Sequence, residues 1–140
     1  MPSSTKYQVV IDTNVFLSAI LWNGNPEKVL KLWKGKRIAL LLSPSLAEEI
    51  QTVLERSEIS AVDIKVFMQI LKNNSIKLVP KTKYTICRDP DDNQILSLAN
   101  DGKADYIITG DRDLLTLGKI EKTDIVKPKD FLQIIQSKKT

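Results

Sequence analysis

The sequence predicts a three-layer α/β domain with a parallel central sheet. Short apolar runs alternate along the chain with stretches whose apolar residues recur at helical spacing, a pattern typical of a parallel sheet covered by helices on both faces. The chain has 140 residues, of which 42% are hydrophobic, and it carries no internal repeat or linker. That length suffices for a substantial core. We therefore expect a single domain over residues 1–140, with an ordered core at about 7–135.

Five apolar runs are predicted to form the strands. In the first, Val9, Val10 and Ile11 run directly into Asp12 without an alternating polar residue, which favours a central strand buried on both faces. The third run alternates in part and is predicted to lie near an edge of the sheet. The predicted strands cover residues 9–11, 38–42, 76–79, 106–109 and 125–126.

Helices are predicted between the strands from apolar periodicity and from the residues that begin and end helices. Asn25 is expected as an N-cap before Pro26, and Ser60 begins a capping box. Gly102 is expected as the C′ glycine that ends the helix after Pro90. The predicted helices cover 15–22 and 114–117 and otherwise begin near residues 26, 44, 61, 90 and 128.

Composition excludes several classes of function. The chain contains no histidine, which argues against Ser-His nucleophilic catalysis and against histidine-ligated zinc centres. The single cysteine, Cys87, cannot form an internal disulfide, and no apolar run resembles a membrane span or a signal peptide. We therefore expect a cytoplasmic protein with no membrane partner. The net charge of +4 favours anionic partners such as nucleic acid.

Acidic residues follow two of the predicted strands directly. Asp12 stands at the end of the first strand and Asp111 just after the fourth, where parallel sheets place their ligands. Each position has an alternative explanation, because Asp12, Thr13 or Asn14 would also cap the next helix, and so would Asp111 or Asp113. Asp111 lies nearer the strand end, so it is expected to face Asp12 if the two strands are neighbours.

Two further carboxylates are singled out by helical geometry at about 100° per residue. In the helix that follows strand 38–42, Glu49 falls on the flank of the apolar face, whereas Glu48 faces solvent. In the helix that begins near residue 90, Asp92 turns toward the apolar side. The alternative for Asp92 is a role as the N3 partner of Asp89, the expected N-cap of that helix.

These carboxylates are expected to converge, because their strand ends and helix starts all fall on one edge of a parallel sheet. Several carboxylates at one edge repel each other strongly unless a counterion is present. Oxygen ligands without histidine suit a hard cation, Mg²⁺ or Mn²⁺, better than zinc. Such a cation lowers the pKa of bound water, which would let a chain without histidine hydrolyse a phosphodiester.

Taken together, these residues resemble the PIN-domain family, in particular the small prokaryotic, VapC-like proteins that form the toxin component of toxin–antitoxin systems. The resemblance covers about residues 8–132. It rests on four motifs in order: Val10-Ile11-Asp12-Thr13-Asn14-Val15, Ser43-x-x-Leu46-x-Glu48-Glu49-Ile50-x-x-Val53-Leu54, Arg88-Asp89-Pro90-x-Asp92-Asn93 and Thr109-Gly110-Asp111-x-Asp113-Leu114-Leu115.

The resemblance implies a PIN-like, Rossmann-like α/β/α fold with a five-stranded parallel sheet, and an Mg²⁺- or Mn²⁺-dependent endoribonuclease that cleaves single-stranded RNA. It also implies RNA, a cognate antitoxin protein and a second copy of the chain as partners. By position, the resemblance implies four catalytic acids that also bind the metal: Asp12, Glu49, Asp92 and Asp111. It implies Asp113 as an accessory metal ligand, and Asn14 and Thr109 as polar residues that support the site.

Two other functions are weighed against this one. The chain could be a PIN-like module that binds RNA or protein without catalysis, against which the intact acidic set argues. Asp12, Thr109 and Lys127-Pro128 also match a receiver-type phosphoacceptor domain, but the third predicted strand does not end in an acceptor aspartate.

The residues that bind substrate stay open at the level of sequence. Three basic regions are candidates for contact with a phosphate backbone: the cluster Lys28, Lys31, Lys34, Lys36 and Arg37, the pair Lys81 and Lys83, and the basic tail.

Overall fold

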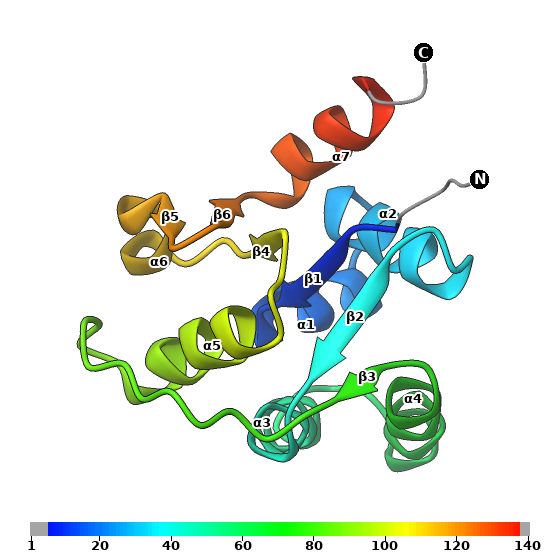
Figure 1. Cartoon of the computed structure of the whole chain (residues 1–140). Helices are drawn as coiled ribbons and strands as arrows, with labels where there is room; N and C mark the ends of the chain where they lie inside the picture. Colours follow the sequence, from blue (N-terminus) through cyan, green and yellow to red (C-terminus); the bar gives the residue numbers. More distant parts are fainter. Residues whose placement is uncertain (1–5, 138–140) are drawn as a thin grey trace.

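The computed structural model describes residues 6–137, which form one mostly parallel sheet flanked by helices (Figure 1). The polar lead-in and the basic tail expected from the sequence fall mainly on residues 1–5 and 138–140, which lie outside the described residues. The strands are β1 (Gln8–Ile11), β2 (Ala39–Leu42), β3 (Ile76–Lys77), β4 (Tyr106–Ile108), β5 (Lys119–Ile120) and β6 (Thr123–Val126). The helices are α1 (Thr13–Leu21), α2 (Asn25–Lys34), α3 (Pro44–Glu55), α4 (Ala61–Asn73), α5 (Pro90–Asp101), α6 (Arg112–Leu117) and α7 (Pro128–Ser137).

The sheet has the strand order β3-β2-β1-β4-β6-β5, with β1 near its centre. All five strands predicted from the sequence are present and pair in parallel, so the predicted α/β class and central first strand are confirmed. The predicted count of five is short by one, because β5 adds a sixth strand antiparallel to β6. The sequence does not reveal β5, since two residues form no apolar run; the hairpin turn at Glu121, with φ of 52°, creates the pairing.

The strand order also excludes the receiver-type fold. Receiver domains share the flavodoxin-like order in which β1 lies between β2 and β3. Here β1 lies between β2 and β4, and β3 forms an exposed edge, as its alternating pattern predicted. The third strand is shorter than the predicted 76–79, because after Lys77 only Leu78 continues the pairing, through its N–H to the carbonyl of Leu42 at 3.0 Å.

The core lies on both faces of β1. Val9, Val10 and Ile11 are completely buried, because α5 contacts β1, β2 and β4 on one face while α1 packs with α2 and α3 on the other (Figure 1). Phe16 of α1 and Trp33 of α2 make edge-to-face contacts with Phe67 of α4, at ring-centroid distances of 5.8 and 6.3 Å. This aromatic cluster holds α1, which carries most of the first motif, against α2 and α4.

Two serines cap helices, and the sequence predicted Ser60 among them. The Ser43 and Ser60 hydroxyls accept hydrogen bonds from the N–H groups of Leu46 and Asp63 at 3.0 and 3.1 Å, so both are N-caps. The prediction for Asn25 is wrong, because Asn25 is already helical and Gly24 occupies the N-cap position.

Gly102 does end α5, but the prediction that it does so as a left-handed C′ glycine is wrong. Gly102 ends α5 with a φ of −86°, and Lys103, at φ 57°, is the left-handed residue. The glycine is needed for space: a Cβ atom there would lie 2.7 Å from Leu41 Cδ1 and 3.0 Å from the carbonyl oxygen of Leu98. The end of α5 therefore sits against β2 at a distance that only glycine permits.

None of the helices within residues 6–137 combines the length and the apolar character needed to cross a membrane.

Replacing Gly102 with Ala should destabilise the protein by about 1–3 kcal/mol, the usual effect of overpacking a filled site. Leu41 is almost fully buried and cannot move away from the added methyl group. The matched control is Gly110→Ala, where a Cβ meets no atom within 4 Å. Urea unfolding of both variants checks the prediction, and equal stabilities would contradict it.

Candidate active site

The predicted acids gather at the carboxyl ends of β1 and β4. The Asp12 N–H donates to the carbonyl of Ile108 at 3.0 Å, which continues the β1–β4 pairing by one residue. From β1 the chain crosses to β2 on one side, whereas from β4 it continues to β6 on the other. Such a switch in direction leaves a crevice beyond the strand ends, where open α/β sheets bind their ligands.

Asp12 is buried at this strand end, with 6% of its surface exposed. It occupies the N-cap position of α1, yet its side chain makes no capping hydrogen bond. Instead its Oδ2 accepts a hydrogen bond of 2.7 Å from the Thr109 hydroxyl. The alternative role of Asp12 as a helix cap is therefore wrong. Burial raises the pKa of Asp12, as do the negative charges of Asp111 and Asp89, and the Thr109 hydrogen bond opposes them.

Thr109 links Asp12 to the turn that carries Asp111. The same Thr109 hydroxyl that donates to Asp12 accepts a hydrogen bond of 2.9 Å from the Asp111 N–H. Asp111 in turn caps α6, because its Oδ2 accepts from the N–H of Leu114 at 3.0 Å. One oxygen of Asp111 thus fixes its carboxylate in place. The strands β1 and β4 are neighbours, the condition on which Asp111 was expected to face Asp12.

Asp92, Asp111 and Asp113 form a close group. Each offers one carboxylate oxygen, and these oxygens all lie within 4.8 Å of one another. Asp92 is buried because it shares the inward face of α5 with Ile95 and Leu96. Burial and then the negative charges of Asp111 and Asp12 raise the pKa of Asp92 to about 7.

The structure does not support the alternative role of Asp92 as a partner in a capping box. Asp89 caps α5 through its own side chain, whose Oδ1 accepts from the N–H of Asp91 at 2.9 Å. Among residues 6–137 no hydrogen bond runs from the Asp89 N–H to the Asp92 carboxylate.

Asp113 is held by Arg88, a residue that sequence reasoning did not single out. The Arg88 guanidinium donates to both oxygens of Asp113 at 3.0 Å. Because Asp111 is the N-cap of α6, Asp113 is not a cap. The Arg88 side chain is 88% exposed, and exposed ion pairs contribute little to stability, so a cation could take the place of the guanidinium at low cost. The only sequence hint was the position of Arg88 directly before Asp89.

Glu49 approaches the crevice from the side of α3. It is half-buried and Glu48 is exposed, as the helical angle predicted. Burial raises the pKa of Glu49 to about 7, with further contributions from the negative charges of Asp91 and Asp12. Glu49 therefore lies beside Asp12 and Asp91, outside the close group of three acids. The sequence analysis did not include Asp91 in the site. Asp91 is exposed, yet its negative charge helps to raise the pKa of Glu49.

Thr13 adds a polar atom that sequence reasoning also missed. Its hydroxyl is buried, with 2% of the residue exposed, and has no hydrogen-bond partner within the described chain. It lies close enough to Glu49 to favour the charged form of that carboxyl. A buried hydroxyl without a partner is uncommon, and here it borders the acidic crevice, where a bound water or ion would satisfy it.

Asn14 and Asn93 have separate positions. Asn14 is exposed and lies outside the acidic group, along a groove that also includes Asp111. Asn93 holds the preceding loop against α5: its Oδ1 accepts from the Cys87 N–H at 2.9 Å, and its Nδ2 donates to the Cys87 carbonyl at 3.0 Å. This two-sided contact places the following residue, Arg88, next to Asp113.

The residues of the crevice fit a divalent cation. The donors are carboxylate oxygens and the chain has no histidine, which is the ligand set that Mg²⁺ and Mn²⁺ favour. Asp12, Glu49 and Asp92 carry raised pKa values because of burial and of neighbouring negative charges, and a bound cation would offset both effects.

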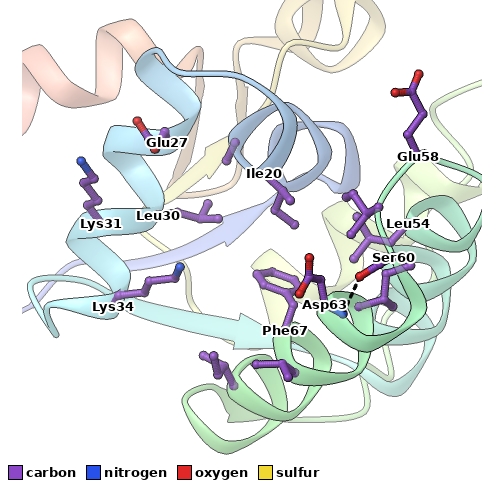
Figure 2. Close-up of a pocket in the computed structure, with 15 residues that line it drawn as sticks. Ile20, Glu27, Leu30, Lys31, Lys34, Leu54, Glu58, Ser60, Asp63 and Phe67 are labelled. Atoms are coloured by element: carbon purple, nitrogen blue, oxygen red, sulfur yellow. Dashed lines mark hydrogen bonds between the residues drawn. The ribbon is translucent and has the colours of Figure 1, made fainter.

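A cavity of about 690 Å³ lies elsewhere (Figure 2). Its interior is apolar, with Leu30, Leu54 and Phe67 among the side chains that Figure 2 labels. Residues of both positive and negative charge also line it: Glu27, Lys31, Lys34, Glu58 and Asp63. None of the predicted site residues lines this cavity, so the acids belong to a separate surface.

Without metal, the stability of the protein should fall as the pH rises from about 4 to about 7. Glu49 and Asp92 have pKa values of about 7 in the folded protein, against 4.5 and 3.8 ordinarily. Between these values the folded state holds more protons than the unfolded state, so raising the pH favours unfolding. Melting temperatures in EDTA across this range test the prediction. Glu49→Gln should flatten the slope and Glu48→Gln should not; a stability that rises toward pH 7 would contradict it.

Comparison with known proteins finds a family model and a relative that match most of the chain. A family model of the PIN domain matches residues 8–113. An uncharacterized protein of Methanocaldococcus jannaschii is 34% identical over 142 residues, covering 91% of each chain.

Two solved structures resemble the fold at low sequence identity. PAE2754 from Pyrobaculum aerophilum has a TM-score of 0.60 at 15% identity, with 96% of this chain and 99% of that chain covered. VapBC2 from Rickettsia felis, solved with a DNA fragment from its promoter, has a TM-score of 0.58 at 16% identity, with 84% and 96% covered. At such identities the likeness shows the fold alone. The match of the family model to most of the chain settles the family, and the chain belongs to the PIN-domain family.

Proposed function

We propose that this protein is an endoribonuclease that cleaves single-stranded RNA with the help of Mg²⁺ or Mn²⁺. The observation that carries the proposal is the group of carboxylates at the β1–β4 strand ends, of which Asp92, Asp111 and Asp113 lie close enough to share one ion. Membership of the PIN-domain family supports it. A module that only bound RNA would gain nothing from buried carboxylates, which repel a phosphate backbone.

In this proposal Asp12, Asp92 and Asp111 hold the cation, and Glu49 completes the set from α3. Asp113 is an accessory ligand once Arg88 releases it. When bound, the cation would supply the Lewis acidity that lowers the pKa of water and neutralises charge on the phosphate.

The other residues of the chain would support these acids. Thr109 keeps the Asp12 carboxylate oriented through its 2.7 Å hydrogen bond, which favours the charged, ligating form. Thr13 offers its buried hydroxyl on the side of Glu49, where it would hold a water molecule or a carboxylate oxygen. Asn14 faces outward, so its support would go to the substrate.

We also propose that the protein acts as the toxin component of a toxin–antitoxin pair, with a cognate antitoxin protein as its partner and with a homodimer as its assembly. The four motifs resemble VapC-like proteins in order and spacing. The shared fold with VapBC2, a pair found on promoter DNA, supports a partner of this kind.

Cleavage of single-stranded RNA should require a divalent cation and should depend on Glu49 but not on Glu48. Glu49→Gln removes a charge that lies beside Asp12 and should lower the cleavage rate by at least about 100-fold, the scale expected when a ligand or its support is lost. Glu48→Gln, one residue away on the exposed face, is the matched control. Gel assays on defined RNAs with Mg²⁺, Mn²⁺ or EDTA measure both effects. Full cleavage in excess EDTA, or equal losses in the two variants, would refute the assignment.

Asp12→Asn should raise the melting temperature in EDTA while it abolishes cleavage. Asparagine can accept the Thr109 hydrogen bond, yet it removes one charge from a crowded, buried group. Mg²⁺ at about 100 times its Kd should stabilise the wild type by ~2.7 kcal/mol and the variant much less. Asp63→Asn, at an exposed position of α4, is the control that should respond to Mg²⁺ as the wild type does. If Asp12→Asn melts lower in EDTA and responds equally to Mg²⁺, Asp12 has a structural role only.

A further inference from the structure

A second concave surface adjoins the acidic crevice, and we propose that it binds the sugar–phosphate backbone of the RNA strand next to the cleaved bond. This groove has a volume of about 560 Å³ and is formed by the first residues of α1, α2 and α7 and by the turn at Gly110. Asp111 belongs to both surfaces, so the groove opens directly from the acidic group. This inference rests on the proposed function, because it assigns a path to that substrate.

The charges of the groove suit a polyanion. Arg112, Lys127 and Lys129 line it and are exposed, and Asp111 is the one acid among its lining residues. Within residues 6–137 none of these three cations lies within 4.0 Å of a carboxylate, since the ion pairs found there involve other cations. Cations without an acidic partner are available to neutralise phosphates, which supply most of the affinity of proteins for nucleic acid.

Helix stability does not explain the two lysines. Lys127 and Lys129 flank Pro128, the first residue of α7. The N-terminal end of a helix carries partial positive charge, so cations there are unfavourable for the helix and anions are favoured. The lysines and the helix end therefore add to the same positive potential over the groove, which would hold a phosphate at some cost to the helix.

The remaining lining residues supply neutral hydrogen-bonding groups. Asn14, Ser18 and Asn25 lie along α1 and the start of α2, and none of their side chains makes a hydrogen bond within the described chain. Amide and hydroxyl groups donate to and accept from ribose hydroxyls and base edges. A side chain at Gly110 would meet no atom within 4 Å, so the backbone turn leaves room for a chain to pass.

Two lysines of the first basic cluster considered from the sequence lie less well for this role. Lys31 and Lys34 border the large apolar cavity, where Glu27, Glu58 and Asp63 offset their charge (Figure 2). That cavity shares no lining residue with the groove. The two lysines would therefore not guide a backbone toward Asp111, whereas Arg112 follows Asp111 directly in the chain.

The test compares two double variants that each lose two positive charges from the same parent protein. Lys127→Ala/Lys129→Ala removes two groove cations, and Lys28→Ala/Lys31→Ala removes two cations of α2 as the matched control. Binding of a short, fluorescein-labelled single-stranded RNA is measured by anisotropy over a range of KCl concentrations. All proteins carry Asp12→Asn to prevent cleavage, and melting temperatures confirm that each is folded.

The groove variant should bind roughly tenfold more weakly at low salt, and the slope of log Kd against log salt should fall by about 1.4, or about 0.7 for each lost phosphate contact. The control should keep the slope of its parent. With Asp12 restored, the groove variant should show a higher KM at a nearly unchanged kcat. Gly110→Leu, which keeps every charge, should weaken binding by filling the groove.

Equal salt slopes for the groove and control variants would overturn the groove assignment, even if the wild type cleaves RNA with Mg²⁺. If the slope depends on Lys127 and Lys129 but the wild type never cleaves RNA, the groove assignment holds and the proposed nuclease function fails. The two ideas therefore fail separately.

Discussion

The site depends on one hydroxyl group, that of Thr109. It donates to Asp12 and accepts from the backbone of Asp111, so a single buried group joins the ends of two neighbouring parallel strands. Both partners are 2.9 Å away or closer, and the residue is completely buried. Without this link, Asp12 would be free to turn back and cap α1, which is the ordinary role of an aspartate at that position. The threonine thereby makes a carboxylate available to the crevice.

As a consequence, the folded protein holds several acids whose charged forms are unfavourable. Asp12, Glu49 and Asp92 all have raised pKa values because they are removed from water and lie near other negative charges. Elsewhere in the chain, hydrogen-bond donors lower the pKa of a carboxylate. The Thr82 side chain and the backbone N–H groups of Thr82 and Lys81 interact with the Asp101 carboxylate and lower its pKa to about 2. At the crevice, burial and neighbouring negative charges outweigh the donors that reach Asp12 and Glu49, and the proposed cation would offset this imbalance.

Three surfaces of different chemistry follow from the helix arrangement. The crevice at the strand ends is acidic, the adjoining groove carries unpaired cations, and the larger cavity beside α2 and α4 is apolar with mixed charges around it (Figure 2). The first two share Asp111 and form one continuous surface, while the third is separate. An acidic centre beside a basic groove is an arrangement that can attract a phosphate chain and still bind a cation at one point along it.

The sequence by itself determined whatever depends on the local geometry of the backbone. Periodicity separated Glu49 from Glu48 and turned Asp92 inward, because the angle between helical neighbours is fixed. Serine caps and a fully apolar first strand were equally local features. Only the tertiary structure decided the contacts between distant segments. Asp12 and Thr109 lie 97 residues apart, Arg88 and Asp113 lie 25 apart, and Gly102 is required by the approach of Leu41. No local pattern encodes such pairs, because they arise when packing brings separate elements together.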